Sequence, residues 1–162
     1  MKAFILALGI AAGFSATAAA QTTTMSCALT SDSEIAHLFD VWNASLETQK
    51  PEEVAKLYSD DAILLPTVSN VPRLTQAERI DYFVHFLENK PRGTIDMRVI
   101  RRGCNDATDA GLYTFTFADG RVVHARYSFT YVLRDGKWLI QSHHSSAMPE
   151  QGNTAQAQAK HN

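Results

Sequence analysis

The pattern of apolar positions along the chain changes from a helical period to a strand period. Between residues 31 and 91, apolar residues recur at every third or fourth position, which is typical of amphipathic helices. From residue 94 onward, apolar and polar residues alternate, which is typical of strands that bury one face. The sequence therefore predicts an α+β fold, in which three N-terminal helices pack on a strongly curved, mostly antiparallel sheet.

Three helices are expected in the first half of the chain. The run Ser31-Asp32-Ser33-Glu34 is a capping box and predicts a helix that continues to about Thr48. Pro51 opens a second, short helix, which we expect to extend to Tyr58. A second capping box at residues 75–78 opens the third helix. Its apolar stripe is expected to comprise Ile80, Phe83, Val84 and Leu87.

Strands and hairpins are predicted in the remainder of the domain. A short buried strand is expected at 62–65, between the second and third helices. Alternating runs then predict strands at 94–99, 113–117, 121–133 and 137–146. Asp119-Gly120 and Asp135-Gly136 are two-residue hairpin signals between the last three of these strands.

Composition and charge exclude several classes of protein. The 162 residues are 45% hydrophobic and 20% charged, with a formal net charge of −2, which argues against nucleic-acid partners and against binding to a membrane surface. Six histidines are present, but no His-x-x-x-His or His-x-His pair occurs, and two cysteines are too few for a cysteine zinc site. There is also no glycine-rich phosphate loop and no nucleophile elbow. We therefore expect neither a metal nor a cofactor.

The N-terminus has the pattern of an export signal. Lys2 is followed by an apolar run over residues 3–14, and Ala18-Ala19-Ala20 fits a cleavage site after Ala20. The alternative is a membrane anchor, for which the apolar run is short. We expect a signal peptide at 1–20, an extension at 21–30, one domain at 31–149 and a disordered tail at 150–162. The mature protein would then be periplasmic or secreted, with no membrane attachment.

Export changes the expectation for the two cysteines. In an oxidising compartment, Cys27 and Cys104 are a plausible pair for a disulfide. The alternative is two unpaired thiols, because sequence does not show whether their Cα atoms lie close enough to be bridged.

Several runs resemble a known family. They are residues 64–70, 82–87, 134–140 and 144–149, and they are similar to the NTF2-like superfamily, most closely to SnoaL-like proteins and bacterial relatives of the calcium/calmodulin-dependent protein kinase II association domain. This resemblance covers about 31–149 and implies a cone with a pocket, and dimers or larger rings built through the sheet. The family's pocket arginine is replaced here by Phe129, so capture of a carboxylate by that arginine does not carry over.

The last strand carries the candidate chemistry. Strand alternation places Trp138, Ile140 and His144 on one face and His143 on the other, so we expect His144 to point into the cone. His144 would then act as a general acid–base, or alternatively as a structural histidine. The expected pocket comprises Tyr58, Asn70, Arg73, Phe115, Phe129, Tyr131, Trp138 and His144.

Acidic partners for a pocket histidine are scarce in the sequence. Asp81 and His85 have i, i+4 spacing and can form either a surface pair or a dyad at the pocket rim. Asp61 and Asp96, near apolar strands, are expected to flank turns or face outward.

Two function classes remain. The first is an exported domain that binds a small organic ligand, serves as a homo-oligomeric scaffold, or does both. The second is a cofactor-free isomerase, lyase or hydrolase that uses the pocket histidine.

Overall fold

The computed structural model describes residues 27, 30–67 and 69–149. The predicted signal peptide with its cleavage site, most of the extension at 21–30 and the predicted tail at 150–162 lie outside the described residues. No helix in the described part of the chain is both long and apolar enough to span a membrane. The elements are α1 (Asp32–Glu47), α2 (Pro51–Ala55), β1 (Tyr58–Leu65), α3 (Gln76–Leu87), β2 (Arg92–Arg102), β3 (Asp106–Thr116), β4 (Val122–Arg134) and β5 (Lys137–Ala147).

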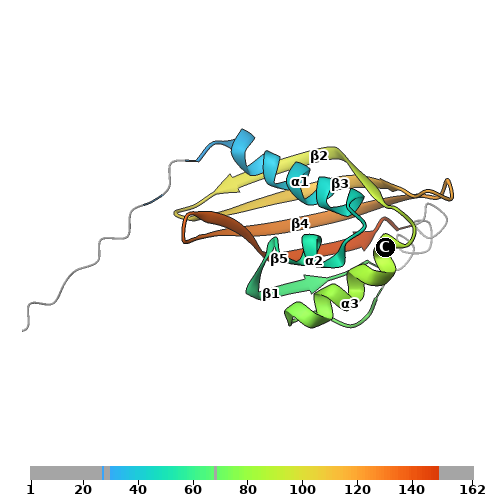
Figure 1. Ribbon diagram of the computed structural model, residues 1–162. Helices are drawn as coiled ribbons and strands as arrows, with labels where there is room; N and C mark the ends of the chain where they lie inside the picture. The colour runs from blue at the N-terminus through green and yellow to red at the C-terminus, as the bar shows by residue number, and fades with distance from the viewer. Residues whose placement is uncertain (1–26, 28–29, 68, 150–162) are drawn as a thin grey trace, which may run out of the picture.

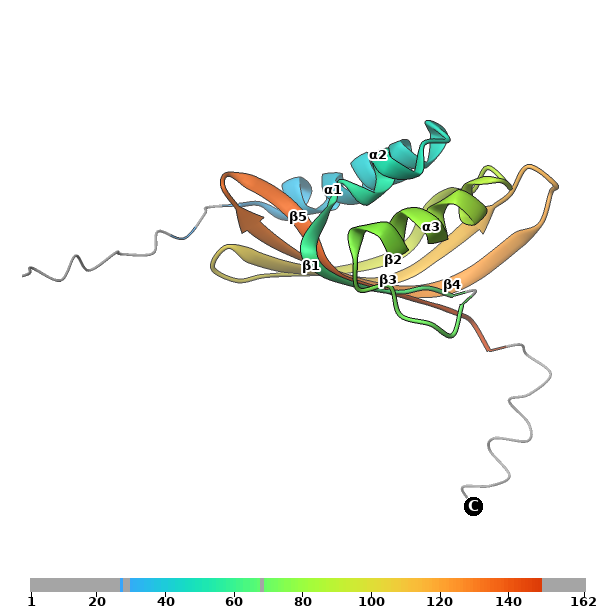
Figure 2. The same cartoon turned by 60° about the horizontal axis from the view of Figure 1, so that its bottom comes forward.

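The strands form one curved sheet with the order β1-β5-β4-β3-β2. β2 to β5 form an antiparallel meander, and β1 pairs with β5 in parallel at the edge. All three helices lie on the same face of the sheet (Figures 1 and 2). The predicted fold class is therefore confirmed.

Local signals account for the helix starts and for one of the turns. Ser31 and Thr75 form the two predicted capping boxes, in each of which the hydroxyl accepts from the backbone N–H of the glutamate three residues later. Asp135 and Gly136 both have positive φ (51° and 75°), which the tight β4–β5 hairpin requires.

The second helix is shorter than predicted. It ends at Ala55, and Tyr58 already begins β1, where it pairs with Ile140 of β5. Parallel pairing and burial of the Tyr58 ring therefore override the weak helical spacing of residues 54–58. The pairing between β1 and β5 is irregular between Tyr58 and Ile63, because β1 bulges there.

A buried arginine on α3 fills this bulge. Arg79 is fully buried, and its guanidinium donates to the carbonyl oxygens of Ala62 (2.7 Å), Ser59 (3.1 Å) and Asp60 (3.3 Å). The buried face of α3 is therefore centred on Arg79, Phe83 and Leu87. The predicted stripe is wrong for Val84, which is 45% exposed, because the helix is rotated to bring Arg79 onto the bulge.

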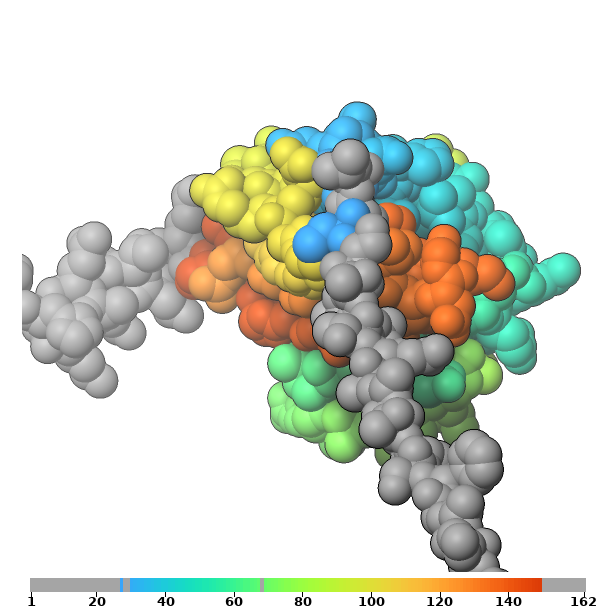
Figure 3. Space-filling model, turned by 90° about the vertical axis from the view of Figure 1, so that its left-hand side faces the viewer, coloured from blue at the N-terminus to red at the C-terminus, as the bar shows by residue number. Residues whose placement is uncertain are grey.

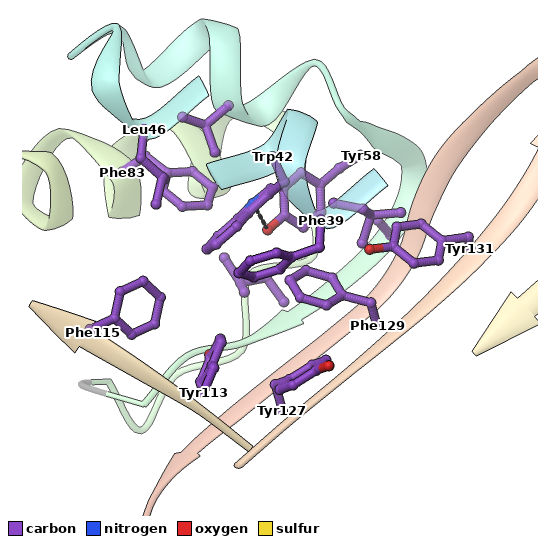
Figure 4. Close-up of a cluster of buried hydrophobic side chains, with 14 of the residues drawn as sticks. Phe39, Trp42, Leu46, Tyr58, Phe83, Tyr113, Phe115, Tyr127, Phe129 and Tyr131 are labelled. Carbon is purple, nitrogen blue, oxygen red and sulfur yellow. Dashed lines mark hydrogen bonds between the residues drawn. The ribbon is translucent and has the colours of Figure 1, made fainter. Parts of the chain in front are cut away.

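An aromatic core fills the space between α1 and the inner face of the sheet (Figure 4). Phe39 and Trp42 of α1 pack edge-on against Phe129 of β4, with ring centroids 6.2 and 5.4 Å away. Inward-facing rings of β3 and β4 continue this layer, namely Tyr113, Phe115, Tyr127, Phe129 and Tyr131. The alternation predicted for β4 is therefore confirmed.

A disulfide ties the start of the domain to the β2–β3 connection. Cys27 and Cys104 are bonded, with a Cα–Cα distance of 4.8 Å across 77 positions, so the predicted pairing is confirmed. Nearby, Arg102 bonds to Asp32 and to the carbonyl oxygen of Thr30. Figure 3 looks onto this end of the molecule, where α1 (blue) lies above the β2–β3 connection (yellow) and the β4–β5 hairpin (orange).

Candidate functional site

A largely apolar cavity lies beneath α3, between that helix and the inner face of the sheet. The space between its wall atoms is about 510 Å³ when open solvent at the mouth is included, and the centre of a water-sized molecule has about 40 Å³ of room inside it. Aromatic rings from α1, α3 and β3 supply much of the wall, and β5 contributes the polar side chains of His143 and Ser145. The lining residues are Trp42, Leu64, Pro66, Thr67, Tyr82, Phe83, Phe86, Tyr113, Phe115, Phe117, Arg121, Val123, Ala125, His143 and Ser145.

His143, rather than His144, points into the cone. In the β4–β5 ladder, Tyr131 pairs with Ile140 and the adjacent Thr130 pairs with Ser142, so Gln141 is an extra residue. Such a bulge reverses the alternation of side chains beyond it. His143 therefore lies opposite the inward-facing Phe129 and is 4% exposed, whereas His144 is exposed on the outer face. The prediction that His144 lines the pocket is wrong for this reason.

His143 ends a buried chain of hydrogen bonds. The indole Nε1 of Trp42 donates to the Tyr58 hydroxyl (3.1 Å), and that hydroxyl lies 2.8 Å from His143 Nδ1. The His143 ring also stacks on Phe129, with a centroid distance of 4.0 Å. Burial, with a smaller contribution from the nearby His144, lowers the pKa of His143 from 6.5 to about 3. The imidazole is therefore neutral at physiological pH.

A second set of hydroxyls lies in the same wall. The Tyr113 hydroxyl donates to Ser145 Oγ, which also bonds to Thr67 Oγ1. Burial raises the pKa of Tyr113, so its phenol stays protonated and acts as a donor. The hydroxyls of this set satisfy one another within the wall.

Two arginines lie at the mouth of the cavity. The Arg121 guanidinium lies 4.3 Å from the centre of the Phe117 ring, and that of Arg73 lies 5.9 Å from the Tyr82 ring. Arg73 also donates to the carbonyl oxygen of Val71 and to Ser69 Oγ. Arg73 lines a more open outer hollow that adjoins the cavity and shares Tyr82 and Arg121 with it. The mouth is thus more polar and more positive than the interior.

Asp81 and His85 also line this outer hollow, so both lie at the rim. His85 Nδ1, however, lies 3.4 Å from Glu88 Oε1, in an exposed i, i+3 pair. The structure therefore gives His85 a different carboxylate partner from the one that the i, i+4 spacing suggested.

Of the predicted pocket residues, Phe115 lines the cavity directly. Tyr58 lies behind His143 as its hydrogen-bond partner, and Phe129 and Tyr131 are fully packed in the core (Figure 4). Trp138 packs partly buried against the same core. Asn70 is exposed in the loop after β1 and is not among the lining residues. The sequence predicted that these residues surround an open cavity. In the structure, their large aromatic rings instead fill the narrow end of the cone.

Asp109 of β3 is a fully buried carboxylate that the sequence analysis missed. It accepts from the Tyr127 hydroxyl (2.9 Å) and from Arg98 Nε (3.1 Å). Burial raises the pKa of Asp109, although the bonds from Tyr127 and Arg98 oppose that rise. Strand alternation with Tyr113 and Phe115 was the signal that could have placed Asp109 on the inner face. Asp61 and Asp96 lie outside the core as predicted, bonded to Arg134 and Thr114.

The described residues contain no group of three or more His, Cys, Asp or Glu side chains arranged to hold a metal ion. The cavity wall therefore offers one unpartnered imidazole nitrogen, a set of hydroxyls and a large apolar surface. This arrangement can bind an organic molecule and orient it by a hydrogen bond.

Comparisons with known proteins identify the relatives of this chain. A proposed calcium/calmodulin dependent protein kinase II association domain from Xanthomonas campestris is 46% identical, with 80% of this chain and 99% of that chain covered and a TM-score of 0.70. Two more distant structures share the fold alone. An NTF2-like protein of unknown function from Pseudomonas putida KT2440 is 14% identical, covers 78% of this chain and 92% of its own, and has a TM-score of 0.67. A proposed dehydratase of the NTF2-like family from Streptomyces avermitilis is 9% identical, covers 73% and 96%, and has a TM-score of 0.64.

No protein with a curated function matches this chain significantly. The model of the family described as "Calcium/calmodulin dependent protein kinase II association domain" matches residues 31–149. The chain therefore belongs to the calcium/calmodulin dependent protein kinase II association domain family and has an NTF2-like fold.

Proposed function

We propose that this protein binds a small, largely apolar organic molecule in its cone and that it does so as a homo-oligomer. The observation that carries the first part is the apolar cavity with a buried, unpartnered histidine nitrogen in its wall. Ligand sites of this kind combine an apolar lining with a few polar groups that fix orientation.

Binding is better supported than catalysis. Among the described residues that line the cavity, there is no aspartate or glutamate. His143 is a weak base because burial lowers its pKa to about 3, so it is poorly suited to removing a proton at neutral pH. An isomerase, lyase or hydrolase that uses this histidine as a general base is therefore the less favoured alternative.

Filling the cavity should weaken binding. Val123 lines the cavity, whereas its neighbour Val122 is 51% exposed on the outer face of the sheet. We expect Val123→Phe to weaken binding of small benzene derivatives at least tenfold, because the added ring occupies the space of the ligand. Val122→Phe should leave binding unchanged. Affinities from NMR chemical-shift titration test this, and equal binding by both variants would refute the proposed site.

The outer face of the sheet is the proposed assembly surface. All three helices cover the other face, and the outer face exposes Met97 (48%), Val99 (44%) and Val122. Since the family is named for association, we propose that a second copy of the chain covers this face, in a closed symmetric contact.

Charging that face should separate the subunits. We expect light scattering to report at least a dimer for the wild-type protein and a monomer for the double variant Met97→Glu/Val99→Glu, because paired carboxylates cannot be buried without partners. Val41→Glu is the control, because Val41 is similarly exposed (40%) but lies on α1. A monomeric wild type would contradict the proposed assembly.

We also propose that the protein is exported to the periplasm or the medium after cleavage at Ala20. The Cys27–Cys104 disulfide supports this, because such bonds persist in oxidising compartments. Protein isolated from the native host should begin at Gln21 and should release two thiols only after reduction. Intact Met1 or two free thiols in unreduced protein would contradict export.

A further inference from the structure

The two ring nitrogens of His143 have different surroundings. Nδ1 lies 2.8 Å from the Tyr58 hydroxyl, on the side of the core. Nε2 is buried and has no hydrogen-bond partner among the described residues, although the ring itself lines the cavity and Tyr58 does not. Nε2 is therefore the ring nitrogen left without a partner in the cavity wall, and because it is buried, a bound molecule must displace neighbouring wall atoms to reach it.

The hydrogen-bond chain favours a proton on Nε2 rather than on Nδ1 of His143. Trp42 Nε1 is always a donor, so the Tyr58 hydroxyl accepts from it. The Tyr58 hydroxyl then has its own proton to donate, and His143 Nδ1 is the acceptor within reach. A neutral imidazole that accepts at Nδ1 carries its proton on Nε2.

We propose that His143 is the specificity-determining donor of the cavity, and that its Nε2–H selects apolar ligands with a neutral hydrogen-bond acceptor, such as an aryl ketone or another carbonyl compound. This inference rests on the proposed function and names the ligand class of the same cavity. An unpaired buried N–H is costly, and a ligand carbonyl that reaches Nε2 removes that cost. A hydrocarbon of the same shape leaves the cost in place.

The position of His143 favours a carbonyl over a carboxylate. The two arginines near the cavity, Arg73 and Arg121, lie at its mouth, while the His143 ring packs against the rings of Trp42 and Phe129. Burying a carboxylate against a neutral imidazole would cost more free energy of desolvation than the hydrogen bond contributes. Removing a neutral carbonyl oxygen from water costs far less free energy. A neutral carbonyl is therefore the better acceptor for the Nε2–H of His143.

The test compares two probes of nearly equal shape, acetophenone and α-methylstyrene. Acetophenone has a carbonyl group (C=O) where α-methylstyrene has a methylene group (C=CH₂), which accepts no conventional hydrogen bond. We expect wild-type protein to bind the ketone about tenfold more tightly, from NMR titration, because one buried hydrogen bond distinguishes the two. In His143→Phe both probes should bind with equal affinity. In His144→Gln, which changes the exposed neighbour, the preference should remain.

A direct observation of the tautomer keeps the inference testable if His143→Phe fails to fold. Long-range ¹H–¹⁵N spectra of wild-type protein should show a protonated Nε2 and an unprotonated Nδ1 for His143. A proton on Nδ1, or equal wild-type affinities for the two probes, would overturn the inference and leave the binding function intact. Failure of both probes to bind would overturn the proposed function, and the ligand class with it.

Discussion

Acidification from pH 7 to pH 4 is expected to destabilise the fold by about 3 kcal/mol through His143 alone. The pKa of this histidine is about 3 in the folded protein against 6.5 for the ordinary side chain. Between these values the unfolded chain binds a proton that the folded chain does not, so stability falls as the pH falls. The contribution of His143 is complete above pH 6.5 and is lost progressively toward pH 3.

Two substitutions isolate this effect from that of the carboxylates. His143→Phe removes the titrating group from the core, and His144→Gln removes its exposed neighbour. Urea unfolding at pH 7 and pH 4 should show a much smaller acid-induced loss of stability for His143→Phe than for wild type. The loss for His144→Gln should be only slightly smaller than that of wild type, because His144 makes the smaller contribution to the lowered pKa of His143. His143→Phe should be less stable than wild type at pH 7, because it leaves the Tyr58 hydroxyl without its acceptor. An unchanged pH dependence in His143→Phe would show that this imidazole titrates normally.

Carboxylates also change the stability of the fold on acidification, and different carboxylates change it in opposite directions. Hydrogen bonds from Arg134 lower the pKa of Asp61 to about 2, so protonation of Asp61 adds to acid destabilisation. Burial raises the pKa of Asp109, so its protonation has the opposite sign. The variants His143→Phe and His144→Gln are therefore needed, because the pH dependence of wild-type stability combines the contributions of His143, Asp61 and Asp109.

Patterns within single elements predicted most of the fold. The capping residues Ser31 and Thr75, the Asp135-Gly136 hairpin and the alternation of rings in β4 each depend on local chemistry, and each occurs in the structure. The two-residue hairpin predicted at Asp119-Gly120 is wrong, because Phe117 pairs with Arg121 and leaves a three-residue loop between β3 and β4. The same period-2 rule failed in β5, where the extra residue Gln141 exchanges the faces of His143 and His144. A bulge depends on how two strands pair, so alternation within one strand does not reveal it.

The candidate site was harder to predict because its residues come together from separate elements. Its key chain joins Trp42 of α1, Tyr58 of β1 and His143 of β5. The parallel pairing of β1 with β5, which brings Tyr58 beside His143, leaves no local mark in the sequence. Aromatic residues were expected to line the pocket, but Phe129 and Tyr131 pack in the filled end of the cone.

Replacing Arg79 by methionine is expected to cost about 3–5 kcal/mol of folding stability. Methionine keeps much of the apolar volume but removes the donors that bond the carbonyl oxygens of Ala62, Ser59 and Asp60. Those oxygens belong to the bulge of β1, where regular pairing with β5 is interrupted. Unpartnered carbonyl groups in a buried position are costly, so the loss concerns strand β1 as well as helix α3.

The matched control is Arg101→Met, because Arg101 is exposed on β2 and donates to the carbonyl oxygen of its own neighbour Ile100. A surface change of this kind should alter stability by no more than about 0.5 kcal/mol. Urea unfolding followed by tryptophan fluorescence measures both variants, and Arg79→Lys should recover part of the loss because lysine restores a charged donor on α3. Equal stability of Arg79→Met and Arg101→Met would show that β1 keeps its bulge without the guanidinium. Tyr58 would then reach His143 through strand pairing alone.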